Sequence, residues 1–178
     1  RLDFNEMANP YCHKKCNQEK RREMTEDGLC IETVSVIDGL PVRCVGEWAM
    51  KKIFHLVQYF GIFSTGMKNS WNGKINYIEI CSGTGRCINR SNGVEFNGTA
   101  ICILEHEAYK YLNQSLFIDY NHKVIDALNQ RIAESKITNA KAIYGNYHNP
   151  SAICKEILLA TQGVGLNLVF IDPTDCSV

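Results

Sequence analysis

A glycine-rich turn directly after a short apolar run is the part of this sequence best suited to chemistry. The β-forming residues Tyr77, Ile78 and Ile80 lead into Cys81-Ser82-Gly83-Thr84-Gly85. Glycines in such a turn carry no Cβ, so the backbone can pass close to a ligand. The full dinucleotide-binding fingerprint has a third glycine where this chain has Ile88. The turn therefore predicts close ligand contact at Gly83 and Gly85 without fixing which ligand.

Polar residues also follow the later apolar runs. Asp119 ends the run 116–118, Asn146 follows the run 142–144, and Asp172-Pro173 follows the run 166–171. Open α/β sheets bind ligands at the carboxyl ends of their strands. A carboxylate at this position can accept hydrogen bonds from both hydroxyls of a ribose, so Asp119 is a candidate ligand contact, with helix capping as the alternative. The amide of Asn146 could reach an adenine edge, although Gly145-Asn146 is also a good turn.

Glu79 lies within the first apolar run, where a carboxylate is expected to be buried. A buried carboxylate needs hydrogen-bond partners. We expect the backbone amides of the glycine turn to supply them, which would make Glu79 part of the framework of the site.

The elements that must position these residues alternate along the chain. Strands are predicted at 75–81, 115–119, 141–145 and 166–171, and helices at 46–63, 99–112, 121–134 and from Pro150 onward. Asn121 is the expected N-cap of its helix, and Pro150 suits a first helical turn. This order predicts an α/β fold with a mostly parallel sheet and helices on both faces. Because such sheets usually have more strands, we expect the C-terminal part of the domain to be missing.

The first 45 residues are polar and form a predicted N-terminal arm, separate from a Rossmann-like domain at 46–178. The arm holds Cys12, Cys16, Cys30 and Cys44. The Cys12–Cys16 spacing is within the range of zinc sites, and four thiolates could complete a tetrahedral Zn²⁺ site. The wide gaps to Cys30 and Cys44 leave an iron–sulfur cluster and unrelated thiols as alternatives.

Charge and composition exclude some classes of protein. The formal net charge is zero, from 19 basic and 19 acidic residues, which argues against a broad electrostatic nucleic-acid surface. No apolar run approaches the roughly 18 residues of a membrane span. The odd count of nine cysteines and the lack of a recognisable signal peptide favour a reducing, cytoplasmic setting. The absence of an initiator methionine suggests that upstream residues have been removed.

The motif Ile78-Glu79-Ile80-Cys81-Ser82-Gly83-Thr84-Gly85 resembles the first motif of class I S-adenosylmethionine-dependent methyltransferases. The wider order of motifs resembles the three-Cys-motif partner (TcmP) family over roughly residues 46–175. The pieces that carry this resemblance are the helix from Trp48 to Tyr59, Phe96-Asn97-Gly98-Thr99, Phe117-Ile118-Asp119, Gly145-Asn146 and Phe170-Ile171-Asp172-Pro173.

The resemblance implies a Rossmann-like methyltransferase fold that binds S-adenosylmethionine. It implies cofactor contacts from Glu79, Cys81, Gly83, Gly85, Asp119 and Asn146. Asp172 would then orient or deprotonate the methyl acceptor, and a radical-type three-Cys-motif protein would be the partner. The family usually has Phe-Gly where this chain has Thr174-Asp175. The alternative function is therefore a catalytically inactive binding module that associates with protein or nucleic acid.

Overall fold

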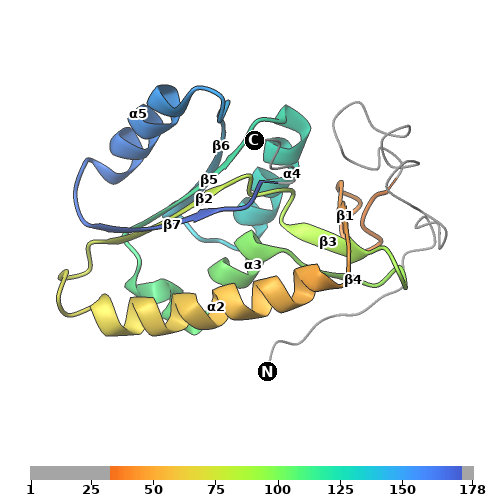
Figure 1. Ribbon diagram of the computed structural model, residues 1–178, viewed down its shortest axis with the longest axis horizontal. Helices are drawn as coiled ribbons and strands as arrows, with labels where there is room; N and C mark the ends of the chain where they lie inside the picture. The colour runs from red at the N-terminus through yellow and green to blue at the C-terminus, as the bar shows by residue number, and fades with distance from the viewer. Residues whose placement is uncertain (1–32, 174–178) are drawn as a thin grey trace.

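Four parallel strands form the central sheet of the computed structural model, which describes residues 33–173 (Figure 1). In spatial order they are β6 (Ala140–Tyr144), β5 (Gln114–Asp119), β2 (Ile75–Ile80) and β7 (Leu166–Ile171). All three pairings are parallel. The predicted strands are thus confirmed to within one or two residues, and the mixed α/β fold is compatible with a Rossmann-like arrangement.

Helices cover both faces of this sheet, as the sequence predicts. They are α2 (Trp48–Met67), α3 (Thr99–Leu104), α4 (His122–Glu134) and α5 (Pro150–Thr161). Side chains alternate across a strand, so Tyr77 of β2 packs in the core with α2, α3 and α4. Its neighbour Ile78 packs instead with Ile153 of α5. Figure 1 shows α2 and α5 on opposite sides of the sheet.

Helix boundaries follow local capping. The Asn121 side chain accepts hydrogen bonds from the backbone N–H groups of Lys123 and Val124, which confirms the predicted N-cap of α4. Pro150 occupies the first turn of α5. The predicted helix at 99–112 is in fact two pieces, because α3 ends at Leu104 and a separate 3₁₀ helix, η1 (Glu107–Tyr111), follows.

The buried face of α2 agrees in part with the sequence pattern. The three-to-four spacing predicted an apolar stripe of Trp48, Lys52, His55, Leu56, Tyr59 and Phe63, widened by Ile53, Val57 and Phe60. Ile53, Val57 and Phe60 are buried, together with Ala49 and Ser64. Trp48, His55 and Tyr59 are exposed, because the buried face is turned by about one residue, or about 100° around the helix, from Trp48.

A second, three-stranded sheet lies beside the N-terminal end of α2 (Figure 1). Its strands are β1 (Arg43–Val45), β3 (Arg86–Asn89) and β4 (Glu95–Asn97), none of which was among the strands predicted from the sequence. An isolated bridge joins Val34 to Pro41. Among residues 33–173, no helix has both the length and the apolar character needed to cross a membrane.

Candidate functional site

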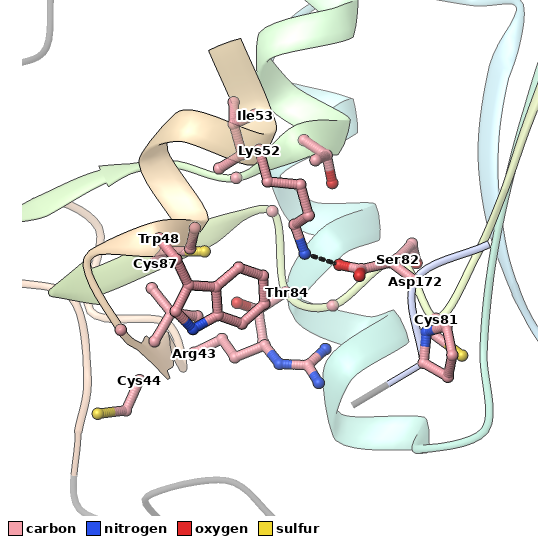
Figure 2. A pocket seen from close by; sticks show the side chains of 18 of the residues that line it. Arg43, Cys44, Trp48, Lys52, Ile53, Cys81, Ser82, Thr84, Cys87 and Asp172 are labelled. Atoms are coloured by element: carbon pink, nitrogen blue, oxygen red, sulfur yellow. Dashed lines mark hydrogen bonds and ion pairs between the residues drawn. The ribbon is translucent and has the colours of Figure 1, made fainter. Parts of the chain in front are cut away.

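A cavity of about 320 Å³ opens at the carboxyl edge of the parallel sheet. The glycine turn after β2, the residues after β7, the first turns of α2 and the strand β1 all contribute to its lining. Residues that follow the two neighbouring strands β2 and β7, among them Ser82 and Asp172, line the cavity together (Figure 2). It therefore occupies the position where open α/β sheets bind ligands.

The glycine turn has a backbone shape that side chains would oppose. Gly83 and Gly85 have φ angles of 68° and 86°, in the left-handed region. A Cβ at Gly85 would come within 2.9 Å of Leu128 Cδ1 and 3.0 Å of Ile101 Cγ1. Cys81 adopts φ 66° without being glycine, and its side chain lines the same cavity. Burial raises the pKa of the Cys81 thiol to about 11, so the thiol is protonated at neutral pH.

Asp119 holds the turn from behind. Its carboxylate accepts a hydrogen bond from the Gly83 N–H at 3.0 Å and another from the Asn121 N–H at 3.2 Å. The residue is only 6% exposed and is not among those that line the cavity. The sequence placed Asp119 at the site. The geometry gives it a contact with the turn itself, as well as with the residue that caps α4.

Glu79 is fully buried, as expected, but its partners are not the amides of the turn. The carboxylate accepts hydrogen bonds from the Tyr77 hydroxyl at 2.9 Å and from the Thr99 hydroxyl. Burial raises the pKa of Glu79 from 4.5 to about 7, against the lowering effect of these two hydrogen bonds. Because Thr99 begins α3 and lines the cavity, Glu79 connects β2 to the wall of the site.

Asp172 extends into the cavity and forms an ion pair with Lys52 of α2 (Figure 2). The two side chains are 30% and 27% exposed. Hydrogen bonding from the Asp172 N–H to the Ile80 carbonyl, at 3.1 Å, continues the pairing of β7 with β2 beyond the strand. The carboxylate thus lies in the same cavity as the glycine turn and remains partly accessible.

Arg131 of α4 supports the back of the turn, and nothing in the sequence indicated this. Its Nη1 donates to the Thr84 carbonyl at 2.6 Å, and its guanidinium also pairs with Asp38 at 2.8 and 2.9 Å. Burial would raise the pKa of Asp38, but the hydrogen bonds from Arg131 and from the Leu40 N–H, with the positive charges of Arg131 and Arg86, together hold that pKa below its usual value. Arg131 lies 47 residues from Thr84 and 93 from Asp38, so no local pattern could reveal the contact.

No family model, curated protein or solved structure matches this chain. The functional interpretation therefore depends on the residues and geometry of the site and on the resemblance of its motifs.

Asn146 lies after β6, outside the cavity lining. Its side-chain oxygen accepts from the His148 N–H at 2.9 Å, which is the turn role considered as the alternative. Exposed aromatic rings surround this edge of the sheet. Tyr120 packs edge-on against Tyr147, with ring centroids 5.6 Å apart.

The predicted metal ligands are not brought together within the described part of the chain. Cys12, Cys16 and Cys30 lie outside the described residues. Cys44 is in β1, buried with Val42 and Ile88. Between residues 33 and 173, no group of three or more His, Cys, Asp or Glu side chains is arranged to hold a metal ion.

Several cavity residues were absent from the predicted site. They are Arg43, Trp48, Lys52, Ser82 and Arg90. Trp48 and Lys52 were interpreted as part of the apolar face of the helix predicted at 46–63. Arg43 and Arg90 reach the cavity only because β1 pairs with β3, with Arg43 opposite Cys87 and Val45 opposite Asn89. That pairing spans more than 40 residues of sequence and has no local signature.

Proposed function

We propose that this protein is an S-adenosylmethionine-binding, methyltransferase-like protein of the three-Cys-motif partner type. The observation that carries the proposal is a single cavity lined by both the Gly83-Thr84-Gly85 turn and Asp172. These are the two motifs that the resemblance assigns to the cofactor and to the acceptor. They lie 87 residues apart in sequence (172 − 85 = 87) and meet at the carboxyl edge of adjacent strands.

The strand order supports a Rossmann-like fold. In chain order, the four parallel strands β2, β5, β6 and β7 are first, second, third and fourth, and their spatial order is third-second-first-fourth. That is the order of the first four strands of the doubly wound nucleotide-binding sheet, with the reversal between the first and fourth strands. The cavity lies at this reversal, where such sheets bind their ligands.

The residues of the turn fit an S-adenosylmethionine-type ligand. Two glycines leave the backbone open to close approach, and Ser82 Oγ is a buried hydroxyl without a hydrogen-bond partner among the described residues. Asp119 fixes the Gly83 amide and so maintains the shape of the turn that would contact the ligand. Bound S-adenosylmethionine would supply a methyl group on a sulfonium sulfur, which keeps the electron pair when the carbon–sulfur bond breaks.

Asp172 is the carboxylate in reach of an acceptor in this cavity. An acceptor nitrogen or oxygen that bonds to a methyl carbon must lose a proton, and Asp172 could orient the acceptor or receive that proton. Lys52 holds Asp172 in the cavity through the ion pair. Most of the catalytic effect would come from alignment of the two reacting atoms.

A catalytically silent binding module is the second candidate. The ion pair with Lys52 favours it, because Asp172 already has a partner within the cavity. Methyl transfer from labelled S-adenosylmethionine in the presence of candidate acceptors would separate the two. The radical-type partner and a Zn²⁺ ion at Cys12, Cys16, Cys30 and Cys44 stay predictions. Elemental analysis of protein purified without added metal tests the zinc site.

Calorimetric titration with S-adenosylhomocysteine tests the proposed cofactor. Gly83→Val should abolish binding, since the branched side chain opposes φ 68° and enters the space beside the Arg43 side chain, 3.4 Å from the Cβ position. Gly73→Val is the matched control. Gly73 has φ 74°, and a Cβ there would meet no atom within 4 Å, so it carries similar backbone strain away from the cavity.

Gly73→Val should bind S-adenosylhomocysteine like the wild type. The proposal is overturned if the wild-type protein does not bind the ligand, or if Gly83→Val binds it as tightly as Gly73→Val does.

A further inference from the structure

The charged side chains that line the cavity are unbalanced. Arg43, Lys52 and Arg90 contribute three cations, whereas Asp172 is the one carboxylate in the lining. Lys52 is paired with Asp172. The other ion pairs among residues 33–173 join Arg86 to Glu95 and Arg131 to Asp38, so neither Arg43 nor Arg90 has a carboxylate partner there. Two guanidinium charges in the cavity are therefore left for an anion.

Both arginines are held by the backbone of the small sheet. The Arg90 N–H donates to the Val45 carbonyl at 2.9 Å, which fixes Arg90 next to β1. Its Nε is buried and has no hydrogen-bond partner among the described residues. A buried donor without a partner is unfavourable, and a ligand oxygen could satisfy it. Arg43 extends from β1 into the cavity beside the glycine turn (Figure 2), with Nη1 3.4 Å from the Gly83 Cβ position.

An indole ring stands next to these cations. Trp48 is 62% exposed and lines the cavity. A Cβ at Gly46 would lie 3.0 Å from Trp48 Cδ1 and Nε1, so a side chain there would crowd the ring. Lys52 Nζ lies 4.6 Å from the ring centroid. The indole thus lies beside Gly46 and Lys52, and most of its surface is open to a ligand.

The N-terminal end of α2 adds to the positive potential. Gly46, Trp48 and Ala49 all line the cavity, whereas the N-cap of this 20-residue helix, Glu47, is exposed and is not part of the lining. The helix dipole places partial positive charge at this end. Planar guanidinium groups bind phosphate with paired hydrogen bonds. Aromatic rings beside basic groups are the combination that binds nucleotides by stacking and charge.

We propose that this cavity recognises a nucleotide-type methyl acceptor, with its phosphate at Arg43 and Arg90 and its base against Trp48. The inference rests on the proposed function, because it assigns the acceptor of the same site. A simple carboxylate ligand would need the arginines but would leave the exposed indole without a role. A free nucleotide and the backbone of single-stranded nucleic acid share the recognised chemistry, and the experiment separates them.

The test is calorimetric titration of the wild-type protein with AMP, adenosine, CMP, cytidine and a short single-stranded oligonucleotide at one fixed ionic strength. Each monophosphate should bind at least about tenfold more tightly than its nucleoside, the equivalent of one charge-assisted contact. Equal affinity of nucleotide and nucleoside overturns the proposal without any need for a variant. Tighter binding of the oligonucleotide identifies nucleic acid as the source of the phosphate, and tighter binding of the monophosphates identifies free nucleotide.

Variants locate the binding. Arg43→Gln and Arg90→Gln should each weaken AMP binding about tenfold, and Trp48→Ala should weaken both AMP and adenosine. Lys51→Gln is the matched control, because the substitution removes the same charge at a residue outside the cavity. Lys51 is exposed on the first turn of α2 and is not part of the cavity lining. An equal loss in Lys51→Gln would show that attraction is unspecific and would overturn the inference.

Titration of the same variants with S-adenosylhomocysteine separates this inference from the proposed function. S-adenosylhomocysteine binding without AMP binding overturns the nucleotide acceptor alone. AMP binding without S-adenosylhomocysteine binding overturns the proposed function and the acceptor role. If Arg43→Gln and Arg90→Gln weaken S-adenosylhomocysteine but leave AMP unchanged, the arginines hold the carboxylate of the cofactor and the inference fails.

Discussion

Asp119 and Asp172 occupy equivalent positions, each at the carboxyl end of a strand that pairs with β2, yet their surroundings differ. Asp119 is 6% exposed and accepts from two backbone amides. Asp172 is 30% exposed in its side chain and faces a cavity, held by one lysine. The first carboxylate shapes the turn and the second is available to a ligand. A strand-end position therefore brings a residue to a site, but its hydrogen-bond partners determine what it can do there.

The largest effect on stability is expected from Asp119→Ala. The substitution removes two acceptor oxygens and leaves the N–H groups of Gly83 and Asn121 without partners in a buried place. Hydrogen bonds to charged groups contribute about 1.5–3 kcal/mol each, so the loss of two should lower the free energy of unfolding by about 3–6 kcal/mol. Urea denaturation followed by circular dichroism measures it. A loss below about 1 kcal/mol would contradict the structural role of Asp119.

Glu79 sharpens the comparison, since it is a third carboxylate at this end of the sheet and is wholly buried. Its pKa is raised from 4.5 in the unfolded chain to about 7 in the folded protein, so the folded state binds the proton more tightly. Its contribution to stability is therefore complete below pH 4.5 and is lost as the pH rises to about 7. Over that window the free energy of unfolding should fall by on the order of 3 kcal/mol.

The measurement is urea denaturation of wild type and Glu79→Gln at a series of pH values between these limits. The variant carries no titrating group at this position, so its stability should change less with pH than that of the wild type. Parallel profiles for the two proteins would show that Glu79 does not change its protonation state in this range.

The smallest effect on stability is expected from Asp172→Ala. Its ion pair with Lys52 is partly exposed, and such pairs contribute about 0–1 kcal/mol. The unfolding midpoint should therefore stay close to that of the wild type, while any methyl-transfer activity should fall. A loss of stability as large as that of Asp119→Ala would remove the distinction between the two carboxylates.

The central sheet and its helices could be predicted from local sequence patterns. The strands β2, β5, β6 and β7 each contain a short apolar run with turn residues after it. The cap of α4 at Asn121 is a contact between residues two and three positions apart. The turn at Gly83 and Gly85 could be read for the same reason, because its backbone shape depends on residue types at adjacent positions.

Long-range contacts explain what the sequence could not predict. Arg131 reaches Thr84 and Asp38 from α4, and Arg43 reaches the glycine turn from β1. In each case the residue is an ordinary surface type in its local segment, and its role depends on an element distant in the chain. The burial of Trp48 was mispredicted because α2 has apolar residues at both buried and exposed positions. The apolar pattern alone therefore does not show which face of the helix packs against the core.

Hydrogen–deuterium exchange with and without S-adenosylhomocysteine tests the central claim most directly, because it locates the ligand as well as detecting it. The account predicts slower exchange at residues 81–85 and at the amide of Asp172, with unchanged exchange in η1 and in the last turn of α4, which lie away from the cavity. Gly73→Val should give the wild-type pattern and Gly83→Val should show no protection. Protection confined to η1 or α4, or none anywhere in the wild-type protein, would contradict the assignment of this cavity as the cofactor site.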